Sequence, residues 1–210
     1  MADPYIVIGQ AGTGSVPVEA ALTLAGLPYR VEEVRAVDFG KHNPMRQIPA
    51  LVTPAGELIT ESAAILIWLA DIHPEAGLAP RIESPERAQF LRWMAFVSSA
   101  IYALYWIRDL PSRLAANEAQ EALVRERTAE RIRHCWSVME AQVSPVDYLL
   151  GDRIGVLDLY VTVLSRWGPR RKVFYEAAPK MAEVVRRVDA EPRLAALWAE
   201  RFPFGEGWEG

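Results

Sequence analysis

Short apolar runs fill the first third of the chain, and apolar residues at three- and four-residue steps fill the rest. Runs typical of strands lie at 5–8, 29–34, 47–52 and 58–60. Apolar residues at helical spacing, bounded by proline or glycine, lie at 16–25 and 62–72. The resulting order β-α-β-β-β-α predicts a four-stranded mixed sheet with helices on both faces.

Strand signals almost vanish after residue 86, where long helical patterns take over. Helices are predicted at 86–110, 117–143, 156–167, 176–188 and 192–200. Between the two regions, Gly77 to Pro85 has the proline-containing composition of a linker. We therefore expect a sheet-containing domain at 1–77, a linker at 78–85 and an all-α helical bundle at 86–210.

Composition and charge narrow the functional classes. The 210 residues are 51% hydrophobic and carry a formal net charge of −4, which argues against nucleic acid as the main partner because phosphate contacts need a basic surface. Cys135 is the single cysteine and the three histidines form no ligand-spaced cluster, so we expect no disulfide and no metal site. The chain shows no basic leader and no apolar run of about 18 residues, so we expect a soluble, cytoplasmic protein that does not enter a membrane.

The stretch 47–62 combines two features that suit a small peptide-like ligand. Pro49 begins a strand, and Ile48 before it is biased to an extended backbone. If the bond between them is cis, the backbone N–H and C=O of Ile48 turn out of the sheet and are free to pair with a ligand. Glu61 and Ser62 open a helix, whose first N–H groups favour a carboxylate while Glu61 accepts from an amine. An ordinary hairpin with a trans edge proline and a capping Ser62 explains the same residues.

The same stretch resembles the glutathione-binding segment of the glutathione S-transferases. The runs Q-I-P-A-L at 47–51 and L-x-T-E-S-A-A-I-L-x-W-L-A at 58–70 match motifs of that family. The resemblance implies a thioredoxin-like domain followed by an all-α domain, with a cis-proline at Pro49. It also implies that Ile48 pairs by its backbone with the cysteinyl part of glutathione and that Glu61 and Ser62 hold the γ-glutamyl end. Glutathione is then a co-substrate, and the protein is expected to be a homodimer.

Residues that lead into this segment add further candidates. Asn43-Pro44 stands where the family often has N-P, but Arg46 replaces a common glycine. We expect Gln47 to contact the backbone of the ligand, unless it is a solvated turn residue. Lys41 and His42 are candidates for contact with the glycyl carboxylate.

A second, weaker resemblance lies in the helical region. The run Y-L-L-G-D-R-I-G-V-L-D-L-Y at 148–160 is similar to a family segment in which a Ser or Thr and an Asp cap the buried helix. Gly155 replaces the hydroxyl residue, so half of the reciprocal cap is missing. Asp158 is still able to accept the backbone N–H of residue 155, which predicts a structural role.

Other chemistries fit the glycine-rich loop at 9–15 less well. Pro17 stands where a dinucleotide fingerprint needs its third glycine, and Ser15 stands where a P-loop needs lysine. No cysteine lies between 9 and 17, which argues against a disulfide oxidoreductase.

We expect the start of the helix near 15–17 to lower the pKa of a glutathione thiol, because thiolates are favoured near helix N-termini and hydrogen-bond donors. Ser15 and Thr13 carry the two hydroxyls there. We favour Ser15 as the donor to sulfur, with Thr13 as the second candidate. By resemblance, Gly14 falls where bacterial beta-type members place a cysteine, Ser15 on their adjacent serine, and Thr13 nearer the serine of zeta- and theta-type members. Alternatively, Ser15 is only a helix cap and catalysis is weak or absent.

The second substrate is expected between the domains, against residues late in the first long helix: Tyr102, Tyr105, Trp106 and Arg108. The C-terminal aromatics Phe202, Phe204 and Trp208 are candidates for a lid. Aromatic side chains in a helical bundle also suit its core, so each has a structural alternative. If exposed, Ile67 and Trp68 suit a dimer contact.

Taken together, these observations predict a glutathione transferase that activates the thiol for attack on a small, hydrophobic electrophile. Two alternatives stay open. One is another glutathione-dependent enzyme on the same fold, either a dehalogenase or an isomerase of the maleylacetoacetate type, whose S-S/C-x-R loop is not present at 12–17. The other is a non-catalytic binding or interaction module.

Overall fold

A four-stranded mixed sheet forms the core of the N-terminal region in the computed structural model, which describes residues 3–34, 40, 43–167, 171–205 and 207. The strands are β1 (Tyr5–Gly9), β2 (Tyr29–Glu33), β3 (Ala50–Val52) and β4 (Leu58–Thr60). Their order in the sheet is β2-β1-β3-β4, with β1 parallel to β2 and the other pairs antiparallel. The mixed sheet predicted from the sequence is therefore present, with β3 shorter than expected because Pro49 does not join the ladder.

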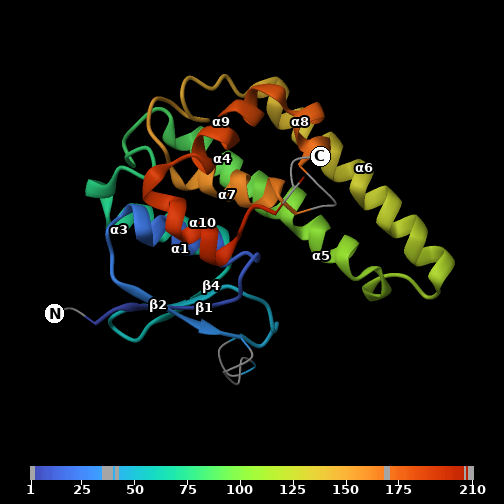
Figure 1. Cartoon of the computed structure of the whole chain (residues 1–210), viewed down its shortest axis with the longest axis horizontal. Helices are drawn as coiled ribbons and strands as arrows, with labels where there is room; N and C mark the ends of the chain where they lie inside the picture. Colours follow the sequence, from blue (N-terminus) through green and yellow to red (C-terminus); the bar gives the residue numbers. More distant parts are fainter. Residues whose placement is uncertain (1–2, 35–39, 41–42, 168–170, 206, 208–210) are drawn as a thin grey trace.

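Two helices separate this sheet from the rest of the molecule. They are α1 (Val16–Leu24) and α3 (Ser62–Ile72), which pack against each other and against the central helix of the second region. Figure 1 shows both helices between the sheet and the helical part of the chain. In the loop that leads to Asn43, residues 41–42 lie outside the described part of the chain.

The remainder of the described chain is helical. Its α-helices are α4 (Arg87–Phe96), α5 (Ala103–Asp109), α6 (Glu118–Gln142), α7 (Val156–Ser165), α8 (Lys172–Ala177), α9 (Pro179–Asp189) and α10 (Ala195–Arg201). A π-helical segment, η2 (Val97–Tyr102), joins α4 to α5, and the short 3₁₀ turns are η1 (Pro74–Ala76), η3 (Pro111–Arg113) and η4 (Pro192–Leu194). The helix expected at 176–188 is wrong at its start, because Pro179 begins α9 and separates it from α8.

Helix α7 lies at the centre of this region, and all of its residues are buried. It contacts α1, α3, α4 and α9, so it joins the two parts of the molecule. The long helix α6 projects outward along one side, as Figure 1 shows, which agrees with its many charged residues.

The stretch Arg87–Asp109 is long and apolar enough to cross a membrane by length and composition alone. The sequence expectation counted only unbroken apolar runs and therefore missed it. Core helices of soluble proteins pass the same test, and this stretch packs against α6 and α7.

Asp158 holds the start of α7 in place. Its carboxylate accepts the backbone N–H groups of Leu149 and Gly155, both at 2.8 Å. Burial raises the pKa of Asp158 to about 7, against the opposing effect of these bonds. A Cβ atom at Gly155 would lie 2.8 Å from the backbone oxygen of Leu78, so the glycine allows the linker to approach α7 closely. The structural role predicted for Asp158 agrees with this geometry.

We expect Asp158→Ala to lower the free energy of unfolding by about 2 kcal/mol or more, because two backbone donors lose their acceptor. Denaturant titration measures this change. Asp152→Ala, an exposed acid on the same connection, is the matched control and should shift stability by less than about 0.5 kcal/mol. Equal effects of the two substitutions would contradict the capping role.

Candidate functional site

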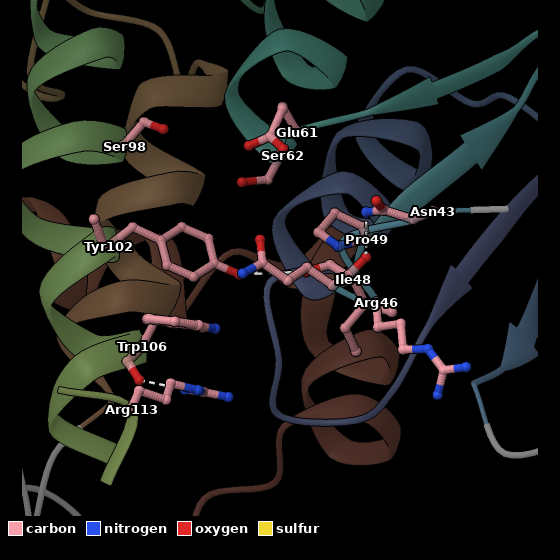
Figure 2. A pocket seen from close by; sticks show the side chains of 12 residues that line it. Asn43, Arg46, Ile48, Pro49, Glu61, Ser62, Ser98, Tyr102, Trp106 and Arg113 are labelled. Atoms are coloured by element: carbon pink, nitrogen blue, oxygen red, sulfur yellow. Dashed lines mark hydrogen bonds between the residues drawn. The ribbon is translucent and has the colours of Figure 1, made fainter. Parts of the chain in front are cut away.

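A cavity of about 390 Å³ lies where the N-terminal loops meet η2 and α5. Figure 2 shows it open between Tyr102 and Trp106 on one side and Ile48, Pro49 and Glu61 on the other. The five residues predicted to bind glutathione all line it: Gln47, Ile48, Pro49, Glu61 and Ser62. The lining is completed by Asn43, Arg46, Ser98, Tyr102, Ala103, Trp106 and Arg113. Of these, Ser98, Ala103 and Arg113 were not singled out from the sequence.

The loop before the strand is held by a buried amide. Asn43 donates from Nδ2 to the Gln47 carbonyl oxygen at 2.8 Å, and its Oδ1 accepts the Met45 N–H at 2.9 Å. The Ile48–Pro49 bond that follows is cis, as the resemblance implied. Asn43 thus fixes the turn that leads to Ile48, a role visible in the sequence only as the N-P dipeptide.

Both non-glycine residues with positive φ in the described chain line this cavity. Arg46 has φ 52° and Glu61 has φ 68°. Such backbone conformations are uncommon for residues with a side chain and concentrate at functional sites. At Glu61 the conformation turns the chain from β4 into α3, so the first N–H groups of α3 border the cavity.

Ser62 connects the cavity to the helical region. Its hydroxyl lies 2.9 Å from the hydroxyl of Tyr160 on α7. Burial raises the pKa of Tyr160 to about 12, so its proton stays in place. Ser62 is 5% exposed and lines the cavity.

A second cavity, of about 420 Å³, borders the loop between β1 and α1. All four residues predicted for the second substrate line it: Tyr102, Tyr105, Trp106 and Arg108. Gly12, Thr13, Gly14, Asp109, Arg166, Trp167 and Phe202 complete the lining. Tyr102 and Trp106 border both cavities, so the two spaces adjoin.

Five of the residues that line this second cavity are aromatic: Tyr102, Tyr105, Trp106, Trp167 and Phe202. The Trp167 ring meets the Tyr102 and Tyr105 rings edge to face, at centroid distances of 4.8 and 5.5 Å. Arg108 is held by Asp109 at 2.8 Å, and the guanidinium of Arg166 lies 3.7 Å from the Phe202 ring centroid. The space is therefore suited to a flat apolar ligand.

The structure separates the two candidate hydroxyls. Ser15 is fully buried; its hydroxyl lies 2.8 Å from Glu19 Oε1 and 3.1 Å from the Gln10 carbonyl oxygen. Thr13 lines the second cavity, and its hydroxyl donates to the same Gln10 carbonyl at 2.6 Å. This placement argues against the preference for Ser15, because its side chain borders neither cavity.

Glu19 is part of a buried ionic network that the sequence reading missed. Arg201, on α10, contacts Glu19 Oε2 at 2.7 Å, and its Nη1 lies 2.6 Å from Glu33. The backbone of Arg201 also accepts the Gly12 N–H at 2.8 Å, while Trp167 Nε1 donates to the Gly12 carbonyl at 2.9 Å. The backbone N–H and C=O of Gly12 thus both hydrogen-bond to the helical region. The sequence signal for this network was Glu19 itself, a single acid within the otherwise apolar helix Val16–Leu24.

Three predicted contributors lie outside the described residues: Lys41, His42 and Trp208. The other C-terminal aromatics are described. Phe202 lines the second cavity, and Phe204 lies beside Arg166, 4.1 Å from its guanidinium.

Comparison with known proteins agrees with this geometry. A family model described as "Glutathione S-transferase, N-terminal domain" matches residues 15–72. The computed structure superimposes with a TM-score of 0.83 on a glutathione transferase homolog from Sulfitobacter solved with bound glutathione, at 25% identity over 95% of this chain and 99% of that one. Residues 15–72 match the N-terminal domain of the glutathione S-transferase family, and the chain as a whole has the fold of a glutathione transferase homolog.

Two curated relatives align with most of this chain. The uncharacterized GST-like protein YncG of Escherichia coli is 27% identical over 90% of this chain and 94% of its own length. A protein of Pseudomonas aeruginosa named maleylacetoacetate isomerase is 27% identical over 86% of this chain and 88% of its own length. The predicted fold class, a thioredoxin-like region followed by an all-α region, is confirmed.

We expect Ser15→Ala to lower the free energy of unfolding by about 1–3 kcal/mol, because the buried Glu19 carboxylate loses a hydrogen-bond donor. Denaturant titration measures the change, with the exposed Ser99→Ala as the matched control. A Ser15→Ala protein that is as stable as wild type but inactive would instead place Ser15 at the reacting sulfur.

Proposed function

We propose that this protein is a glutathione transferase that joins the thiol of glutathione to a small, hydrophobic electrophile. One observation carries the proposal. The cis Ile48–Pro49 turn and the start of α3 face a single cavity, and that cavity adjoins an aromatic one beside the N-terminus of α1. The first space suits a peptide with free charged ends, and the second suits its apolar reaction partner.

Glutathione lies in the first cavity in this proposal. Its cysteinyl backbone pairs with the backbone groups of Ile48, beside Gln47 and Pro49. The γ-glutamyl carboxylate meets the first N–H groups of α3 and the Ser62 hydroxyl, where the helix dipole favours negative charge. The γ-glutamyl amine donates to the Glu61 carboxylate, which is exposed and able to accept it.

The sulfur then points toward the loop before α1, where the aromatic cavity begins. The thiol loses its proton to solvent, and the thiolate is stabilised by the N-terminus of α1 and neighbouring donors. Its electron pair forms the new C–S bond while the leaving group departs with the electrons of the bond that breaks. Tyr102, Tyr105, Trp106 and Arg108 border the electrophile, and Thr13 lies nearer to it than Ser15 does.

The remaining expectations belong to the same proposal. Residues 1–77 act as the glutathione-binding domain, 78–85 as the linker and 86–210 as the domain that walls the electrophile site. The protein works in the cytoplasm as a homodimer. Ile67 and Trp68 are half-buried, and the Trp68 ring meets the Tyr5 ring edge to face at a centroid distance of 6.5 Å. In the proposed dimer, the exposed parts of the Ile67 and Trp68 side chains make the contact.

A glutathione-dependent isomerase is the second candidate, because one full-length relative is named maleylacetoacetate isomerase. An isomerase regenerates glutathione in each cycle, whereas a transferase consumes it. Following the concentration of free thiol during turnover therefore separates the two reactions. Retention of glutathione without turnover of any electrophile would support a non-catalytic binding module.

We expect Glu61→Gln to raise the Kd for glutathione about tenfold or more, because one charge-assisted hydrogen bond is lost. Glu57→Gln, an exposed acid on the β3–β4 turn, is the matched control and should leave Kd unchanged. Titration calorimetry with reduced glutathione measures both, and conjugation of a generic aryl halide by the wild type tests the transfer itself. Failure of the wild type to bind glutathione would contradict the proposed function.

A further inference from the structure

Gly14 leaves a space at the start of α1 that another side chain fills. A Cβ atom built on Gly14 would overlap the hydroxyl oxygen of Tyr102 and lie 2.9 Å from its Cζ. Tyr102 ends the π-helical segment η2 and lies across the first cavity from Ile48 and Pro49, as Figure 2 shows. The Tyr102 hydroxyl therefore occupies the position that a side chain at residue 14 would take.

The same hydroxyl lies beside the group that positions the cysteinyl part of glutathione. Within the part of the chain that the structure describes, the Tyr102 hydroxyl donates one hydrogen bond, a long one of 3.5 Å to the carbonyl oxygen of Ile48. Tyr102 borders both cavities, so its hydroxyl lies where the peptide site and the aromatic site meet. A sulfur placed between the two spaces is within its reach.

The hydroxyls of the loop itself are already engaged. Thr13 donates to the Gln10 carbonyl at 2.6 Å, and the Ser15 hydroxyl lies against Glu19 and that same carbonyl. A donor bond to sulfur from either residue would break a shorter internal bond. Tyr102 gives up only its weak contact with Ile48, so its proton is the most available of the three.

Packing fixes the direction of the Tyr102 ring. The ring meets the Trp167 and Tyr160 rings edge to face, at centroid distances of 4.8 and 6.1 Å. The titratable groups that face it are Tyr160 on α7 and Glu61 at the start of α3. Burial, with smaller effects of these two groups, raises the pKa of Tyr102 well above its usual value, so the hydroxyl stays protonated and acts as a donor.

We propose that Tyr102 is a catalytic residue whose hydroxyl donates a hydrogen bond to the sulfur of glutathione, in the space left by Gly14. The inference rests on the proposed function. The thiol proton goes to solvent, the thiolate accepts the bond from Tyr102 Oη, and Tyr102 keeps its own proton throughout. Thr13 and Ser15 shape the loop, and the hydroxyl that stabilises the thiolate comes from the helical region.

Tyr102→Phe tests the assignment, because it removes the hydroxyl and keeps the ring. The pKa of the bound thiol, followed by the ultraviolet absorbance of the thiolate against pH, should rise by about one unit or more. The kcat/KM for an aryl halide should fall about tenfold or more near neutral pH and approach the wild-type value at high pH, where the thiol ionises unaided. The Kd for glutathione, measured at a pH below the bound-thiol pKa where the thiol is protonated in both proteins, should stay within about twofold. Tyr148→Phe, on the connection between α6 and α7, controls for loss of a tyrosine hydroxyl elsewhere.

A transplanted hydroxyl provides the second test. Gly14→Ala should displace the Tyr102 hydroxyl and raise the bound-thiol pKa as Tyr102→Phe does. The double variant Tyr102→Leu, Gly14→Ser places a new hydroxyl where the Tyr102 hydroxyl was. Its bound-thiol pKa should be lower than that of Tyr102→Leu alone. The backbone at Gly14 does not require positive φ, so only space limits this substitution.

An unchanged thiol pKa in glutathione-bound Tyr102→Phe would overturn the assignment and leave the proposed function intact. A wild type that does not bind glutathione would overturn both. If Thr13→Val raises the pKa of the bound thiol and Tyr102→Phe leaves it at the wild-type value, the donor is Thr13 instead.

Discussion

The buried ion pair between Glu19 and Arg201 is the constraint on which the site depends. It joins the first helix to the last one, 182 positions away in the sequence, and Ser15 adds a hydrogen bond from the loop side. Removing one partner of such a pair leaves an uncompensated charge and costs about 3–5 kcal/mol. Because the backbone of Arg201 also holds Gly12, the same contact sets the distance between the loop and the aromatic wall of the second cavity. Ordering of the loop between β1 and α1 is therefore linked to docking of α10.

Much of the N-terminal half was predictable from local patterns. Strand and helix periods, the prolines and the glycines gave the order of elements, and the motifs at 47–51 and 58–70 pointed to the five cavity residues. The positions of the helices in the second half were also predictable, but two of the predicted helices, at 86–110 and 176–188, are interrupted in the structure. The π segment at Val97–Tyr102 interrupts the helix predicted at 86–110, and the spacing of apolar residues did not predict it.

The contacts that decide the chemistry join residues far apart in the sequence, which explains why reading the loop by itself favoured Ser15. A serine at the start of a helix looks the same whether it faces a ligand or a buried acid. Its partner Glu19 lies one turn further along an apolar helix, and the charge that stabilises Glu19 comes from the other end of the chain. Gly14 has no side chain, and the space that this leaves is occupied by the hydroxyl of Tyr102. Because Tyr102 lies 88 positions later in the sequence, the loop alone could not reveal this contact.

A crystal structure of the wild-type protein with bound glutathione tests the central claim most directly. The account predicts a glutathione backbone paired with Ile48, a γ-glutamyl end at Glu61 and Ser62, and a sulfur within hydrogen-bonding distance of the Tyr102 hydroxyl above Gly14. A sulfur directed at Thr13 or toward Ser15 and away from Tyr102, or a glutathione bound outside this cavity, would contradict it.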